Sequence, residues 1–167
     1  GEYLMYLSTL PQQIKPVLLF SGAANAVTCD TVSLKNVLKF WWLVFHAGSS
    51  DTDLVLTPTQ ATDVASGTNK ATQTTHVFWK DIDAGTTSDT LVVQTAAASM
   101  TIDPATENPA LYIIECDPAL HLDHANSYDC VYLADSGGHA SNTVRIFGLA
   151  LMKDQGQVAL TTSIIVD

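Results

Sequence analysis

The first stretch that could do chemistry is residues 134–139, which read ADSGGH. Asp-Ser-Gly-Gly is the sequence that surrounds the nucleophile of trypsin-like serine proteases, so Ser136 is a candidate nucleophile. A catalytic serine needs a histidine base and an orienting acid. His46 lacks the usual setting of that base, and Ala134 stands where a glycine would supply an oxyanion donor. Because Asp, Ser and Gly-Gly are typical loop residues, we interpret the stretch as a hairpin loop and predict that the chain is not an enzyme.

Two histidines three residues apart, His121 and His124, form the second candidate, with Asp117 and Asp129 nearby. On a helix this spacing would place both rings on one face, where zinc could bind. Pro118 and the polar residues that follow favour a loop or a single 3₁₀ turn instead. We therefore expect surface histidines and no metal, with a metal site at these histidines or at the acidic loops as the open alternative.

Acidic pairs could in principle hold calcium, which takes oxygen ligands. None of them shows the spacing of a calcium-binding loop, and we interpret them as turn formers. We expect no cofactor. The pairs are Asp51 with Asp53, Asp81 with Asp83, and Asp103 with Glu107.

Three tryptophans, Trp41, Trp42 and Trp79, could form a platform for a carbohydrate. Neighbouring residues of a strand point to opposite faces, so only one of Trp41 and Trp42 can share a face with Trp79. We expect these side chains to serve mainly in core packing.

The charge balance excludes several classes of partner. The chain has 17 acidic and 7 basic residues and a formal net charge of −10. A nucleic-acid binder needs clustered Lys and Arg, so we exclude direct nucleic-acid and acidic-membrane partners. No apolar run has the length of a membrane helix, and we expect no signal peptide. The three cysteines, Cys29, Cys116 and Cys130, are predicted to be buried free thiols in a reducing compartment.

Short runs of β-branched and aromatic residues recur along the chain, separated by turn residues. Apolar residues make up 47% of the sequence, which is ample for a core. Spacings of about 8–12 residues between such runs are typical of a β-sandwich or barrel. The runs predict strands at about 26–34, 38–47, 53–62, 76–81, 89–95, 98–103, 109–116, 128–135 and 143–153, with a tenth at 157–166.

Two of these runs indicate how the sheets are buried. In residues 143–151, one face carries Val144 and Ile146 with small residues, and the other begins with Arg145 and continues with large apolar residues. In residues 38–45 both faces are apolar, which predicts a central strand covered on both sides. Two apolar faces in several strands imply two stacked sheets or an additional partner surface.

A family resemblance lies in the second half of the sequence. An apolar strand ends in Ile-Glu-x-Asp, a short Leu-Asp loop follows, and then come an aromatic-Asp-x-Val strand, an Asn and an alternating strand. In these features the chain resembles virion proteins of tailed bacteriophages, over about residues 30–153. The matching residues are Ile114-Glu115-Cys116-Asp117, Leu122-Asp123, Tyr128-Asp129-Cys130-Val131 and Asn142.

The resemblance implies a jelly-roll-like, all-β sandwich of two antiparallel sheets. It further implies a capsid decoration or cement protein on the capsid exterior, present in the host cytoplasm before assembly. The expected partners are the major capsid protein and the chain itself, as a homodimer or homotrimer. A tail or neck component stays open, and the alternative function is a glycan- or receptor-binding module of a head or tail fibre.

The two ends of the sequence are apolar without a helical period. We expect an N-terminal arm at 1–25, a sandwich domain at 26–155 and a C-terminal strand or arm at 156–167. Such ends either complete the core or dock onto a neighbouring subunit, and both alternatives stay open. The residues expected to make interactions are Tyr3, Leu4, Tyr6, Leu7, Leu10, Ile164, Ile165 and Val166.

Overall fold

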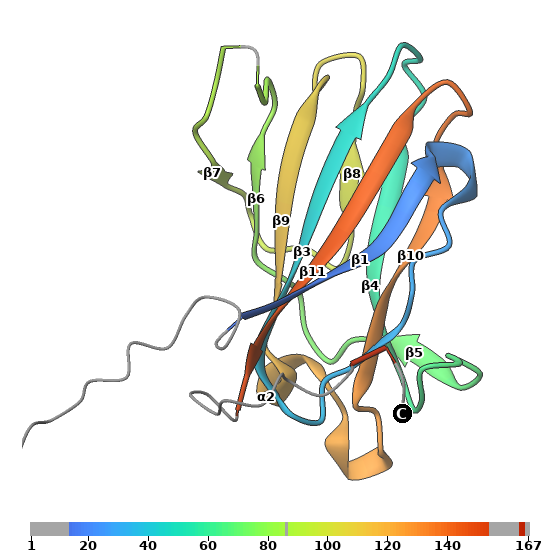
Figure 1. Ribbon diagram of the computed structural model, residues 1–167, viewed down its shortest axis with the longest axis vertical. Coiled ribbons are helices and arrows are strands. Elements are labelled where there is room, and N and C mark those ends of the chain that lie inside the picture. The colour runs from blue at the N-terminus through green and yellow to red at the C-terminus, as the bar shows by residue number, and fades with distance from the viewer. Residues whose placement is uncertain (1–13, 86, 154–163, 166–167) are drawn as a thin grey trace, which may run out of the picture.

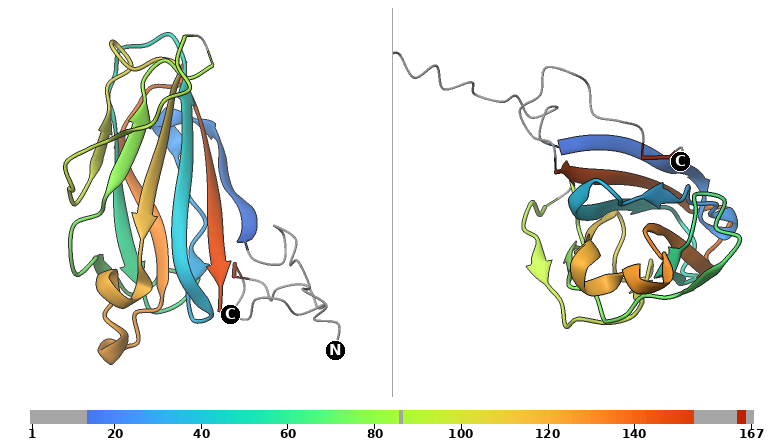
Figure 2. Two further views of the ribbon diagram at one scale, coloured as in Figure 1. Left: turned by 90° about the vertical axis from the view of Figure 1, so that its left-hand side faces the viewer. Right: turned by 90° about the horizontal axis from the view of Figure 1, so that it is seen from below.

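Two antiparallel sheets pack face to face in the computed structural model, which describes residues 14–85, 87–153 and 164–165 (Figures 1 and 2). The predicted all-β sandwich is confirmed. The first sheet, sheet A, has six strands in the order β1-β11-β3-β9-β6-β7. These strands are β1 Ile14–Ala23, β3 Val37–Ala47, β6 Phe78–Asp81, β7 Val92–Val93, β9 Ala110–Cys116 and β11 Thr143–Met152.

The second sheet, sheet B, follows the order β2-β10-β4-β5, with β8 paired to β4. Its strands are β2 Val32–Ser33, β4 Leu54–Ala61, β5 Asn69–Ala71, β8 Met100–Ile102 and β10 Cys130–Gly137. Three short helical turns connect the strands: η1 Ala24–Ala26, α2 Pro118–His121 and η2 His124–Asn126. The jelly-roll connectivity stays a prediction.

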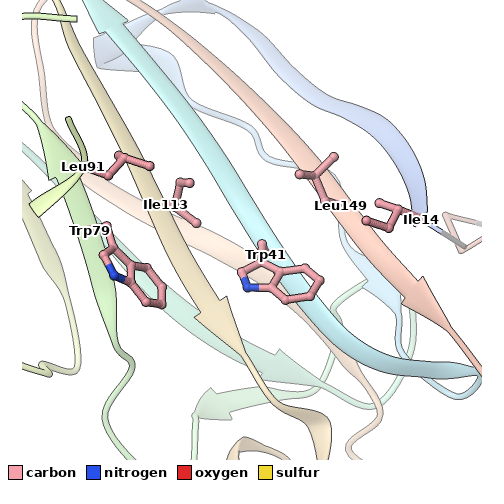
Figure 3. Close-up of a pocket in the computed structure, with 6 residues that line it drawn as sticks. All are labelled: Ile14, Trp41, Trp79, Leu91, Ile113 and Leu149. Atoms are coloured by element: carbon pink, nitrogen blue, oxygen red, sulfur yellow. The ribbon is translucent and has the colours of Figure 1, made fainter. Parts of the chain in front are cut away.

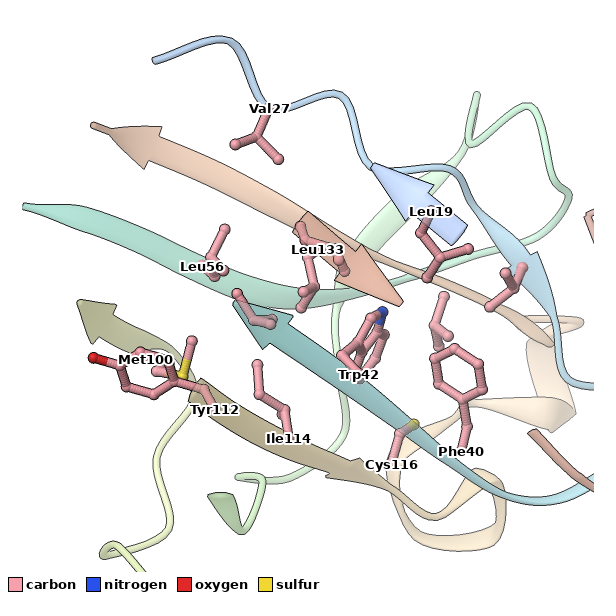
Figure 4. Packing of buried hydrophobic residues seen from close by; sticks show 14 of the residues in the cluster. Leu19, Val27, Phe40, Trp42, Leu56, Met100, Tyr112, Ile114, Cys116 and Leu133 are labelled. Atoms are coloured by element: carbon pink, nitrogen blue, oxygen red, sulfur yellow. The ribbon is translucent and has the colours of Figure 1, made fainter. Parts of the chain in front are cut away.

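The core lies between the sheets, where side chains from β3 and β9 meet those from β4 and β10 (Figure 4). Burial alternates along β9 and β11, as expected for strands with one face inside. In β11 the buried face carries Val144 and Ile146, together with Ala150. The face assignment made from the sequence is thus confirmed for this strand.

β3 differs from its prediction in one respect. Its inner face is fully buried through Phe40, Trp42 and Val44, as expected for the middle of a sheet. Its outer face carries Trp41 and Phe45 and is only half buried. The expectation that the strand is covered on both sides is therefore wrong for the described part of the chain, where sheet B covers one face alone.

The first strand was not anticipated. β1 occupies residues that the sequence assigns to the arm, because Pro16 interrupts the apolar run there. Within the described ranges β1 is an edge strand paired with β11 alone. Proline is tolerated at such an edge because one side of the strand needs no ladder bond. The strand expected at 26–34 is mostly irregular and contributes only β2.

Candidate functional site

An apolar groove crosses the outer face of sheet A (Figure 3). It has a volume of about 540 Å³ and runs from the start of β1 to the segment before β7. All of its lining side chains are apolar or aromatic, so it can hold an apolar segment but offers little for a charged ligand. The lining residues are Ile14, Trp41, Trp79, Leu91, Ile113 and Leu149.

The groove belongs to a wider apolar band on the same face. Strand register places one side chain from each strand of sheet A in a single cross-strand row. Its two ends, Leu18 and Val93, are 55% and 60% exposed, and the members between them are half buried. In strand order the row is Leu18, Phe147, Leu43, Ile113, Trp79 and Val93.

One acidic group borders the groove. The Glu115 carboxylate accepts a hydrogen bond from the Trp41 indole N–H at 3.3 Å and forms an ion pair with Lys39 at 2.8 Å. The hydrogen bond from the Lys39 ammonium to Glu115 raises the pKa of that lysine. The carboxylate is therefore held at the rim by two neighbours and fixes the orientation of the indole.

A second cluster lies inside the fold, where His76, Cys116 and His121 are all buried. Their candidate ligand atoms lie within 4.8 Å of one another. The two imidazole rings stack with centroids 4.0 Å apart and planes 13° apart. Burial lowers the pKa of His76 to about 4 and raises the pKa of the Cys116 thiol, so both groups are neutral near pH 7.

This cluster does not fit a metal ion as it stands. A metal must lie in the plane of each imidazole that binds it, and two nearly parallel stacked rings have no shared point near both nitrogens. Each ring is also engaged elsewhere. Nδ1 of His76 lies 2.8 Å from the Glu115 carbonyl oxygen, and Nε2 of His121 lies 3.2 Å from the Thr75 carbonyl oxygen. The arrangement is a structural one that ties a loop to β9 and α2.

His121 and His124, the candidate zinc ligands of the sequence, have different surroundings in the structure. His121 is buried at the end of α2, whereas His124 is exposed in η2 and its Nε2 lies 3.0 Å from the Pro118 carbonyl oxygen. The expectation that both are surface histidines is wrong for His121. Its ring partner, His76, is 45 positions earlier in the chain, and no sequence spacing links the two.

The Asp-Ser-Gly-Gly stretch ends β10 and is not the expected hairpin loop, because Asp135 to Gly137 pair with β4 and the next strand, β11, lies in the other sheet. Gly137 and Gly138 have φ values of 81° and 74°, which favour glycine. A Cβ at Gly138 would lie 2.2 Å from the Ala24 carbonyl oxygen. The Gly138 N–H donates to the Asp53 carbonyl oxygen at 2.6 Å. Within the described ranges, no histidine nitrogen is hydrogen-bonded to Ser136. The glycines thus have a structural reason to be there.

The acidic pairs mostly bond within their own turns. The Asp81 carboxylate accepts the Asp83 N–H at 3.3 Å, and the Asp103 carboxylate accepts the N–H of Ala105 at 3.0 Å. Glu107 is buried, and its carboxylate accepts the Asp103 N–H at 3.3 Å as well as bonds from the Lys80 ammonium and the Tyr112 hydroxyl. Asp51 and Asp53 are exposed.

The cysteines and terminal residues take different positions. All three cysteines are free thiols, with Cys116 and Cys130 buried and Cys29 half buried. Ile164 is buried in the core, and its carbonyl oxygen accepts the Ser33 N–H at 2.6 Å, whereas Ile165 is exposed. The other expected interaction residues lie outside the described part: Tyr3, Leu4, Tyr6, Leu7, Leu10 and Val166.

Sequence reasoning found part of the groove. Strand parity allowed only one of two neighbouring indoles to share a face with Trp79, and in the structure that residue is Trp41. The expected core packing is confirmed for Trp42 and is wrong for Trp41 and Trp79, which line the groove. The contributions of Ile14 and Leu91 were missed, because they come from sheet edges that the alternating pattern did not place. None of the helices in the described ranges has the length and apolar character needed to span a membrane.

Neither a protein-family model, nor a curated protein, nor a solved structure matches this chain. Its function therefore has to be argued from its own residues. The fold defines a β-sandwich with an apolar outer face on one sheet.

Proposed function

We propose that this chain is a structural protein of a bacteriophage particle, a decoration or cement protein that binds the outside of the capsid shell. In this role the outer face of sheet A and the terminal segments make the contacts, and the sandwich serves as a rigid scaffold. The proposal includes self-association as a homodimer or homotrimer and no catalytic activity. Its sequence support is the resemblance to phage virion proteins over about residues 30–153.

The observation that carries the proposal is the apolar row across all six strands of sheet A. Contiguous apolar patches of this kind mark association surfaces, whereas isolated exposed apolar residues do not. Covering them yields about 25 cal/mol per Å² of apolar surface, before the cost of association. Sheet A therefore has a physical reason to bind a partner at the exposed ends of this row, Leu18 and Val93, which lie outside the groove lining.

The charge balance is consistent with a protein partner. A net charge of −10 keeps the chain away from an encapsidated genome and soluble before assembly. The matching surface on the shell should then be apolar, with neutral or basic residues around it. Because a shell presents many identical sites, even a modest affinity for each site is multiplied when several copies are linked.

Immunogold labelling of purified particles would test the proposal, with antibodies raised against the isolated chain. The particles come from a tailed phage that encodes the chain. The expected result is label on the heads at many positions, and a reconstruction would then place sheet A against the shell. Label confined to the tail would favour the tail or neck alternative, and its absence from particles would overturn the proposal.

A glycan-binding module is the second candidate, because Trp41 and Trp79 share a groove beside the Glu115 carboxylate. Aromatic faces with an acidic neighbour are a common way to bind sugars. The groove lining offers few hydrogen-bonding groups for sugar hydroxyls, which favours the structural role. A glycan array probed with the chain and with Trp79→Ala would decide, since only glycan binding predicts a signal that this substitution abolishes.

A further inference from the structure

The groove begins where the described chain begins. Ile14, the first described residue, lines one end of it, at the start of the edge strand β1. From there the lining crosses β11 at Leu149, β3 at Trp41 and β9 at Ile113 (Figure 3). It ends at Trp79 and Leu91 on the far side. The groove is therefore directly continuous with the peptide bond that joins Ile14 to the preceding residues.

We propose that residues 3–10 of the same chain occupy this groove. From β1 to β6 there are four strand intervals in sheet A, which amount to about 19 Å at 4.8 Å per interval. Eight residues in an extended conformation reach about 26 Å, enough to cross the sheet diagonally. Residues 11–13 can supply the change of direction, since Pro11 is a typical turn residue.

The chemistry of the segment matches that of the groove. Residues 3–10 contain no charged side chain, and six of the eight are apolar or aromatic: Tyr3, Leu4, Met5, Tyr6, Leu7 and Leu10. The groove lining is apolar throughout. Burying apolar side chains on both partners is favourable, and the Trp41 indole N–H in the lining already donates to Glu115.

An arm of the same copy is favoured over a second copy. Covalent attachment next to the groove gives the arm an effective concentration in the millimolar range. The inference does not rest on the proposed function, because it concerns the isolated chain.

Photocrosslinking in the full chain tests the inference. Tyr6 is replaced by p-benzoylphenylalanine, the purified chain is irradiated at low concentration, and crosslinked peptides are mapped by mass spectrometry. The expected product has the mass of one chain and links residue 6 to a peptide that contains Trp41, Ile113, Trp79 or Leu91. Crosslinks to other surfaces, or none at all, would overturn the inference.

The same probe distinguishes the other occupants. A product with the mass of two chains would show that a second copy supplies the arm, and would also overturn the inference. Leu91→Asp should abolish the groove crosslink, because it puts a charge in the lining at a position that is already 39% exposed. Leu18→Asp, exposed on the same face but outside the lining, should leave the crosslink unchanged.

Discussion

The imidazole rings of His76 and His121 stack in the interior, with their centroids 4.0 Å apart. Backbone bonds flank the pair: the Gln73 N–H donates to the His121 carbonyl oxygen at 2.9 Å, and the Glu115 N–H donates to the Val77 carbonyl oxygen at 3.0 Å. The stack therefore joins the segment before β6 to the end of β9 and to α2. Because the His76 ring is buried and its pKa is lowered by that burial, this junction depends on His76 being neutral.

The first prediction concerns the stability of the fold at acidic pH. Burial lowers the pKa of His76 in the folded chain to about 4, from 6.5. Between these values the unfolded chain binds a proton that the folded chain does not, so stability falls as pH drops from 6.5 towards 4. The expected contribution of His76 is a loss of about 2–3 kcal/mol in the free energy of unfolding. Urea denaturation at pH 7, 5.5 and 4.5 would measure it.

Carboxylates also titrate near pH 4, so this measurement needs a matched variant. His76→Gln removes the titrating ring, and its free energy of unfolding should fall less between pH 6.5 and 4.5 than that of the wild type. His139→Gln changes an exposed histidine and should behave like the wild type. Equal losses in all three chains would contradict the assignment to His76.

The second prediction concerns Asn142, whose side chain bonds to the backbone of Ser50 in both directions. Its Oδ1 accepts the Ser50 N–H at 2.9 Å, and its Nδ2 donates to the Ser50 carbonyl oxygen at 2.8 Å. Asn142 is fully buried, so Asn142→Ala would leave two backbone groups unpaired. We expect a loss of about 2–4 kcal/mol in the free energy of unfolding.

Ser50→Ala is the control for that measurement. It keeps the backbone groups that Asn142 contacts and removes only a hydroxyl paired with Thr52. Ser50→Ala should change the free energy of unfolding by no more than about 0.5 kcal/mol. If the two substitutions lower the free energy of unfolding equally, the hydrogen bonds of the Asn142 side chain do not hold these loops together. Gly48 should also resist substitution, because a Cβ there would lie 2.1 Å from the Asn142 Oδ1 atom.

A third prediction concerns His46, which is fully buried in β3 and has no hydrogen-bond partner for either ring nitrogen among the described residues. Burial lowers the pKa of this ring, which is therefore neutral near pH 7. Replacing an unsatisfied buried polar group with an apolar one removes its desolvation cost. We expect His46→Leu to raise the free energy of unfolding by about 1 kcal/mol.

The comparison that checks it is His76→Leu. His76 has partners on both ring nitrogens, Glu115 and Thr72, so the same change there should lower the free energy of unfolding. In thermal or urea denaturation, His46→Leu is expected to raise the free energy of unfolding and His76→Leu to lower it. A destabilised His46→Leu chain would mean that the ring has a partner, such as a bound water.

Alternation along the strands made much of the sandwich predictable from the sequence. Arg145 beside Ile146 gave the faces of β11, and adjacent Trp41 and Trp42 had to diverge. The sequence did not predict β1, because Pro16 reads as a strand breaker unless the strand is known to lie at the edge of a sheet. The stacking of His76 on His121 could not be predicted either, since contacts between distant segments depend on tertiary packing. The groove shares this property, because it gathers residues from the two edges and the middle of one sheet.

The fourth prediction tests whether the apolar row binds the shell. Leu18 and Val93 end the row and are 55% and 60% exposed, so the double substitution Leu18→Asp with Val93→Asp should leave folding intact. Burying each apolar side chain at an interface is worth about 1.5 kcal/mol or more, so affinity for the shell should fall by at least about 100-fold. The readout is the number of copies retained on purified particles, with urea denaturation to confirm that the variant is folded.

Leu38→Asp supplies the control for this last measurement. Leu38 is 50% exposed, but it is the extra residue of a β-bulge and borders a different hollow, beside Pro118 and Lys153, so it belongs neither to the row nor to the groove lining. It adds one negative charge, against two in the double variant, at a similarly exposed position, and should leave the number of copies retained on particles unchanged. A folded double variant that stays on particles at the wild-type copy number would show that the shell contacts another surface. Equal losses for both variants would instead assign the effect to charge in general, because the row would then have no special part in binding.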